Sequence, residues 1–167
     1  MIDAGAMSEL TVRDLLATHE AILAALRERG VVRTEEAPAH QYALWLAHQA
    51  FGGVLQADGD ASHDLTTPDG KRLLVKSCVV RSGRDDERQL APFRSTNFDE
   101  VLVILFDATY EITRAALLTH QQVMRLARWK PHMNGRVLIA RDAVLALGTD
   151  VRRRLPAARP SSPLVAG

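Results

Sequence analysis

The residues best suited to chemistry in this sequence are an aspartate and a lysine on either side of a predicted turn. Asp64 precedes the turn Pro68-Asp69-Gly70, and Lys76 follows it. Because proline presets φ and glycine tolerates the left-handed corner, the sequence predicts a β-hairpin here. Symmetric pairing about Gly70 would place Asp64 opposite Lys76, whereas a two-residue loop would place it opposite Val75. Either register brings a carboxylate close to an ammonium group, which is the skeleton of a metal-dependent phosphodiesterase site.

The elements that must position this pair can be read from apolar periodicity and capping residues. Apolar residues at helical spacing predict helices over 8–29 and from Pro38 to a stop at Gly52-Gly53. The continuous apolar run 101–106 predicts a central strand buried on both faces. The order of elements predicts an α/β domain, a mixed β-sheet flanked by helices. The remaining predicted elements are strands over 54–56, 73–80, 110–117 and 136–140, a helix from the capping box at Thr119 through Trp129, and a helix over 143–147, with Trp45 and Trp129 in the core.

Length and composition predict one globular domain with a substantial core. We expect a flexible N-terminus over 1–7, a single domain over 8–155 and a disordered tail over 156–167, where Pro, Ser, Ala and Gly dominate. The absence of a long apolar run and of secretory features predicts a cytoplasmic protein without membrane association. The single cysteine, Cys78, excludes an internal disulfide and a multi-cysteine zinc site, and a packed thiol is the favoured interpretation.

Charge is distributed unevenly along the chain. Residues 1–70 carry a balance of −7 and residues 71–167 a balance of +8, although the whole chain is near neutral. This asymmetry indicates a basic face able to attract a polyanion, with an ordinary mixed surface as the alternative. His132 and Asn134 lie in a loop where they could contact a ligand, although a turn explains them as well. The candidate nucleic-acid-binding residues are Lys71, Arg72, Arg81, Arg88, Arg94, His132 and Asn134.

The order of elements around the acid, hairpin and lysine resembles the PD-(D/E)xK superfamily, the restriction-endonuclease-like fold. More narrowly, several segments resemble an uncharacterised bacterial family placed near that superfamily. The resemblance implies that Asp64 is the metal-binding acid, holding Mg²⁺, and that Lys76 orients a bound water and offsets developing charge. The resembling segments are Leu26-Arg-Glu-Arg-Gly-Val-Val-Arg33, Tyr42-Ala-Leu-Trp-Leu46, Asp64, Asp69-Gly-Lys-Arg-Leu-Leu-Val-Lys76, Gln89-Leu-Ala-Pro-Phe-Arg94, Phe98-Asp99 and His132-Met-Asn-Gly135.

Two positions depart from the superfamily's pattern. The second acid of the motif, two residues before the lysine, is Leu74, and the acid expected from an early helix falls near Leu44. A hard cation needs several oxygen ligands, and leucine supplies none. Glu35, Glu36 or Gln41 would have to replace them, and no spacing requires that.

Three hypotheses about function follow. The leading one is a domain of this fold that binds nucleic acid, with DNA favoured, and has an incomplete catalytic site. The second is an active Mg²⁺-dependent nuclease that uses Asp64 and Lys76. The third is a non-catalytic scaffold whose partner is another protein or a second copy of the chain, as a homodimer.

Overall fold

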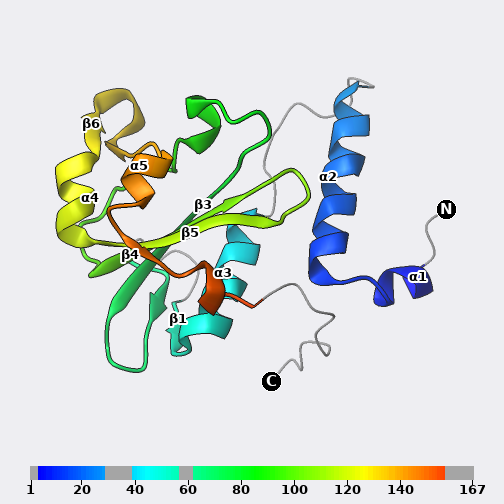
Figure 1. The fold of residues 1–167 in the computed structure, drawn as a ribbon, viewed down its shortest axis with the longest axis horizontal. Helices are drawn as coiled ribbons and strands as arrows, with labels where there is room; N and C mark the ends of the chain where they lie inside the picture. Colours follow the sequence, from blue (N-terminus) through cyan, green and yellow to red (C-terminus); the bar gives the residue numbers. More distant parts are fainter. Residues whose placement is uncertain (1–3, 29–38, 57–61, 157–167) are drawn as a thin grey trace.

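The computed structural model describes residues 4–28, 39–56 and 62–156, which form a mixed α/β fold as predicted (Figure 1). The main sheet has six strands in the order β1-β2-β3-β4-β5-β8, and β6 pairs with β7 in a second, two-stranded sheet. No helix among these residues is long and apolar enough to cross a membrane. The strands are β1 (Val54–Leu55), β2 (Leu65–Thr66), β3 (Arg72–Val79), β4 (Glu100–Phe106), β5 (Ile112–Thr119), β6 (Arg128–Lys130), β7 (Gly135–Val137) and β8 (Thr149–Asp150). The α-helices are α1 (Ala4–Ser8), α2 (Val12–Glu28), α3 (Ala39–Phe51), α4 (His120–Leu126) and α5 (Asp142–Leu145), with short 3-10 turns η1 (Asp85–Arg88), η2 (Pro131–Met133) and η3 (Arg152–Arg154).

Strand β4 lies at the centre of the sheet. It pairs in parallel with β3 and antiparallel with β5, and its residues 101–106 are at most 1 % exposed. The prediction of a central strand buried on both faces is therefore confirmed. On one side β1, β2 and β3 pair antiparallel, and on the other side β4, β5 and β8 do so. The parallel β3–β4 pair joins these two halves.

The alternation of side chains along β4 divides the core into two clusters, one on each face of the sheet. Leu102, Ile104 and Phe106 pack with α3, which covers the first face. Val101, Val103 and Leu105 pack with α4, α5 and the connection 80–99, which cover the second face. Figure 1 shows α3 on one side of the sheet and α4 and α5 on the other.

Helix α2 begins at Val12, not at Ser8 as predicted, because the capping box at Thr11 interrupts the helix. The Thr11 hydroxyl accepts from the Asp14 N–H at 3.1 Å, and the Thr11 N–H donates to the Asp14 carboxylate. A separate short helix, α1, lies within the segment predicted to be flexible. Helix α2 stands beside the sheet (Figure 1), joined to it by ion pairs from Arg13 to Glu111 and from Glu20 to Arg81.

The prediction of a helix through Trp129 is wrong. Helix α4 starts at the predicted capping box of Thr119 and Gln122 but ends at Leu126, since Ala127 is already extended. The next residues form β6 and pair with β7, so tertiary pairing overrides the local helical pattern. Trp129 is consequently 55 % exposed rather than buried in the core. Strand β8 was not predicted.

The hairpin register also differs from both predicted registers. Leu65 pairs with Leu73, and the backbone N–H of Asp64 donates to the Leu73 carbonyl, so Asp64 lies opposite neither Val75 nor Lys76. The Thr67 hydroxyl accepts from the Lys71 N–H at 3.1 Å and donates to Asp69. These bonds close a three-residue loop over 68–70, in which Gly70 has φ +85°.

Several predictions concern residues that the structure does not describe. The predicted end of the first helix at residue 29, the predicted helix start at Pro38, the possible ligands Glu35 and Glu36, and residues 157–167 of the predicted tail lie outside the described residues. The predicted stop of the second helix is confirmed, because α3 ends at Phe51 and is followed by two glycines with positive φ, Gly52 and Gly53.

Candidate functional site

The side chain of Asp64 is hydrogen-bonded to the backbone of β3. Its Oδ2 accepts a hydrogen bond of 2.7 Å from the backbone N–H of Val75. Its own backbone bonds to Gln56 on one side and to Leu73 on the other. The carboxylate therefore provides the acceptor for a β3 backbone N–H at the residue just before β2 begins. This role needs an acceptor at this position, which is a structural reason for an aspartate that does not involve a metal.

Lys76 points toward the second face of the sheet, beneath the 80–99 connection. Its ammonium lies 3.4 Å from the Pro92 carbonyl oxygen and 5.1 Å from the centre of the Phe93 ring. Burial lowers the pKa of Lys76, the neighbouring Asp64 carboxylate opposes this shift, and the Arg94 charge adds to it. Among the ion pairs of the described residues none joins Lys76 to Asp64, so the simple internal salt bridge is not formed.

The two leucines at the positions of the missing acids lie on opposite faces of the sheet. Leu74 is 9 % exposed and belongs to the second-face cluster, whereas Leu44 lies in α3 and packs against the first-face cluster. No group of three His, Cys, Asp or Glu side chains within the described part of the chain could hold a metal ion. One carboxylate, already bonded to Val75, is a poor set of ligands for Mg²⁺. The described residues do not fit the metal that the resemblance implies.

Cys78 is a packed thiol, as predicted. It lies against the second-face cluster, and its Sγ donates to the Gln89 carbonyl oxygen at 3.4 Å. Burial raises the pKa of Cys78 to about 11. At neutral pH the group is therefore a thiol, which is a weak nucleophile.

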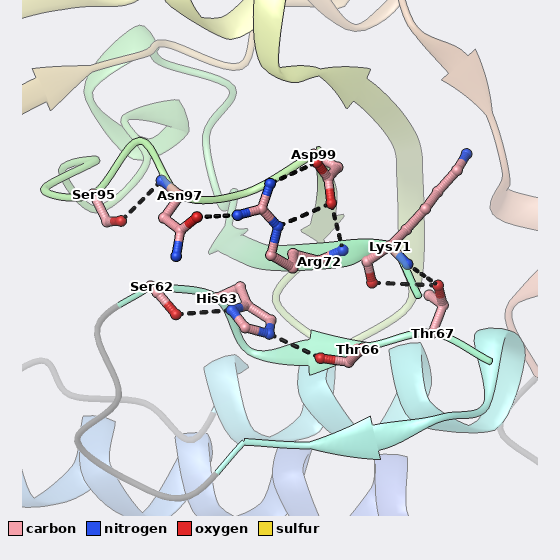
Figure 2. Close-up of polar contacts among 9 residues, drawn as sticks. All are labelled: Ser62, His63, Thr66, Thr67, Lys71, Arg72, Ser95, Asn97 and Asp99. Carbon is pink, nitrogen blue, oxygen red and sulfur yellow. Dashed lines mark hydrogen bonds and ion pairs between the residues drawn. The ribbon is translucent and has the colours of Figure 1, made fainter. Parts of the chain in front are cut away.

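Lys71 and Arg72, two of the predicted nucleic-acid contacts, are paired with acids at the start of β3. The Arg72 guanidinium lies 2.8 Å from Asp99 Oδ1 and also donates to Asn97, as Figure 2 shows. These bonds lower the pKa of Asp99 to about 2. Lys71 lies 3.4 Å from Glu100. Each positive charge at this end of the strand is thus offset by a neighbouring carboxylate.

Arg81 and Arg88 are also paired, and they lie elsewhere. Arg81 bonds to Glu20 of α2 at 2.6 Å, and Arg88 lies 3.2 Å from Asp142 of α5. Arg72 begins the eight-residue strand β3 and Arg81 follows its end, so these two arginines are separated by about 26 Å of strand. The predicted residues therefore do not form one continuous basic face.

A different group of cations has no acidic partner. Phe93 and Arg136 exchange backbone hydrogen bonds of 2.8 and 3.0 Å, and Arg136 pairs with Trp129 across β6 and β7. Directly paired residues of antiparallel strands point to the same face, so an aromatic, a cation and a second aromatic follow one another in a row. We call this row and the cations around it the basic-aromatic surface, which comprises Phe93, Arg94, Arg128, Trp129, Lys130 and Arg136. Because side chains alternate along β6, Arg128 and Lys130 lie on the face of the β6–β7 hairpin opposite Trp129 and Arg136.

None of the four cations of this surface forms an ion pair with a described residue, in contrast to Lys71, Arg72, Arg81 and Arg88. Arg94 lies next to the hairpin, since a Cβ built on Gly135 would be 3.4 Å from its Cγ. Trp129 exposes more than half of its surface although it is a large aromatic. Phe93 is buried in the second-face cluster, so Trp129 is the exposed aromatic side chain of this surface. An exposed aromatic side chain among unpaired cations is a combination that nucleic-acid-binding surfaces use.

His132 and Asn134 form the tip of the β6–β7 hairpin. Asn134 has φ +48° and ends η2, and both side chains are exposed. The favoured interpretation as a turn is therefore confirmed. Of the seven predicted contacts, Arg94 belongs to the basic-aromatic surface, and these two lie at its end.

Trp129 was not recognised as a site residue from the sequence, because the sequence pattern placed this side chain in the core. The signal was present, because Pro131, Asn134 and Gly135 are turn residues between two short runs that could pair as a hairpin. The capping box at Thr119 drew the helical interpretation too far along the chain and hid this hairpin.

Comparisons with known proteins do not assign the chain to a family. Neither a scan against protein-family models nor a search of curated proteins finds a match.

The bond from Val75 to Asp64 allows the structural role of the carboxylate to be tested. Asp64→Ala leaves the Val75 N–H without its acceptor, and we expect a loss of about 1–3 kcal/mol in the free energy of unfolding. Asp64→Asn retains an acceptor oxygen and should lose much less. Urea unfolding of the three proteins measures the difference. Equal stabilities for wild type and Asp64→Ala would show that the bond does not support the fold.

Proposed function

We propose that the chain is a restriction-endonuclease-like domain that binds nucleic acid, with DNA favoured, without cleaving it. Its contact region is the basic-aromatic surface, together with the hairpin tip at His132 and Asn134. The observation that carries the proposal is the exposed ring of Trp129 among the cations Arg94, Arg128, Lys130 and Arg136, none of which is paired with a described acid. Among the other described arginines, Arg13, Arg72, Arg81, Arg84, Arg88, Arg114 and Arg141 are paired with acids, and Arg125 of α4 and Arg152, Arg153 and Arg154 of η3 are not.

Unpaired cations favour polyanion binding because phosphate contacts then displace counterions without first breaking an internal pair. Trp129 adds a flat, half-exposed ring, on which a base could stack irrespective of its sequence. Base stacking requires an unpaired base, so the surface favours single-stranded over duplex DNA. The resemblance to a nuclease superfamily points to the same class of ligand, and Leu74 and Leu44 explain why cleavage is not expected.

Binding to DNA can be measured by fluorescence anisotropy over a salt series. We expect affinity to fall steeply with salt, and to be higher for a labelled single strand than for a duplex of equal length. Arg136→Gln should lower affinity and reduce the salt slope by about one. Trp129→Ala should lower single-strand affinity by about 1–3 kcal/mol and leave the slope unchanged.

The matched control for these variants is Arg84→Gln. Arg84 is also exposed, but its guanidinium is paired with Asp86. Its replacement should leave binding nearly unchanged. Weak binding down to low salt would contradict the proposal, as would an equal loss in Arg84→Gln and Arg136→Gln.

The nuclease hypothesis stays a prediction that a cleavage assay can separate from binding. We expect no cleavage of single-stranded or duplex DNA or RNA with Mg²⁺ or Mn²⁺ that Lys76→Ala removes. The reason is that the described residues offer one carboxylate, already bonded, for a cation that needs several oxygen ligands. Cleavage lost in Lys76→Ala would overturn the non-cleaving part of the proposal and leave the binding part standing.

The scaffold hypothesis is the second candidate, because α2 exposes apolar side chains on one side. Val12, Leu15 and Ile22 are 37–44 % exposed, and their spacing places them on one stripe of the helix. If this stripe joins two copies, sedimentation should show association that rises with concentration and that Ile22→Glu removes. Ala24→Glu, which changes an exposed alanine on the other side of α2, is the control. A monomer at all concentrations would contradict a homodimer.

A further inference from the structure

A cleft of about 600 Å³ lies on the first face of the structure, at the side opposite the basic-aromatic surface. Pockets of this size commonly hold small organic molecules. Helix α2 contributes to its wall through Arg13 and α3 through Tyr42, and Glu111 contributes from the position just before β5. The residues whose chemistry matters are Arg13, Tyr42, Glu111, Asp150, Arg152 and Arg153.

Two arginines in this cleft have no acidic partner. Arg152 and Arg153 are exposed and form no ion pair with a described residue, whereas Arg13 is paired with Glu111. Asp150 is the remaining acid, and its Oδ1 accepts from the backbone N–H of Arg152 at 2.9 Å. The guanidinium groups of Arg152 and Arg153 are therefore available to bind an anion.

Tyr42 supplies a hydrogen-bond donor with no partner. It lines the cleft and is only 4 % exposed, yet its hydroxyl forms no hydrogen bond with any described residue. Its ring is held in place by Phe106 and Trp45, at centroid distances of 5.3 and 6.1 Å. Burial raises the pKa of Tyr42, and the charges of Arg13 and Glu111 also act on it, so its hydroxyl lies near the ion pair of the cleft. The ring is buried, but the hydroxyl oxygen is not among the fully buried unpaired atoms of the described residues, so it opens to the cleft and can donate a hydrogen bond to a ligand there.

We propose that this cleft binds a small organic phosphate monoester, whose phosphate is held by Arg152, Arg153 and the Tyr42 hydroxyl. A phosphate dianion matches two guanidinium groups, and its oxygens accept several charge-assisted hydrogen bonds. Ile112 and Leu155, which also line the cleft, offer an apolar surface for the organic part. The site is distinct from the proposed DNA interface, because Tyr42 belongs to the first-face cluster and Phe93 to the second.

The probes are phenyl phosphate, inorganic phosphate and uncharged phenol, each titrated into the full chain and followed by two-dimensional NMR. We expect phenyl phosphate to give saturable shifts at Tyr42, Arg152 and Arg153, inorganic phosphate to bind more weakly, and phenol not to saturate. Tyr42→Phe should weaken phenyl phosphate binding about tenfold or more, because it removes one donor to a charged group. Arg152→Gln combined with Arg153→Gln should abolish it.

Arg154→Gln is the matched control, because the guanidinium of this neighbouring arginine lies over the Phe51 ring at 4.3 Å and does not line the cleft. This variant should bind phenyl phosphate as the wild type does. The Tyr42 hydroxyl has no partner, so Tyr42→Phe should unfold at the wild-type temperature; if it does not fold, the double arginine variant decides. The proposal is overturned if phenyl phosphate does not saturate at millimolar concentrations, if phenol binds equally, or if Arg154→Gln loses binding as fully as the double variant.

Discussion

The parallel pairing of β3 with β4 determines where the chain must go in the rest of the structure. Parallel neighbours cannot be joined by a tight turn, so the chain leaves the sheet after Val79 and returns at Glu100. The connection crosses the second face and carries Leu90, Phe93 and Phe98 into the core of that face. It therefore covers Lys76 and brings Phe93 and Arg94 beside the β6–β7 hairpin. Without this crossover, neither the burial of Lys76 nor the basic-aromatic surface would exist.

The same constraint explains why the described residues around the acid, hairpin and lysine do not supply a set of metal ligands. Position 74 faces the crossover, and a carboxylate there would be buried among Leu90, Phe93 and Phe98 at a high desolvation cost unless a cation compensated it. Leucine satisfies this environment without any ion. Asp64 is then free to bond the Val75 N–H, and Lys76 to lie against a carbonyl and a ring. Each former candidate for catalysis has a structural partner of its own.

The sequence predicted correctly those elements whose local residue pattern favours the same structure as their packing in the fold. The run 101–106 has only one environment that suits it, and the capping residues at Thr11 and Thr119 do start helices. Patterns failed where a single contact decides between alternatives. The hairpin register goes with a three-residue loop that is closed by backbone and hydroxyl hydrogen bonds of Thr67, and pairing with β7 converts the predicted end of a helix into β6. Such contacts join residues whose proximity is known only once the chain is folded.

The candidate sites were harder to predict than the fold because charge type does not reveal charge pairing. An arginine beside an acid in space is indistinguishable in sequence from one that faces solvent alone: Arg72 and Arg136 look alike until Asp99 is placed next to the first. An unpaired surface cation is itself inexpensive and proves nothing, since water solvates it well. It becomes informative only when a second group beside it, of a different chemical kind, is also open to a ligand. On one face this neighbour is the exposed ring of Trp129, and on the other it is the hydroxyl of Tyr42, which opens to the cleft and forms no hydrogen bond with a described residue. Each surface therefore combines unpaired cations with a second group that is open to a ligand. The ring of Trp129 suits a base of a nucleic acid, and the hydroxyl of Tyr42 suits the phosphate of a monoester.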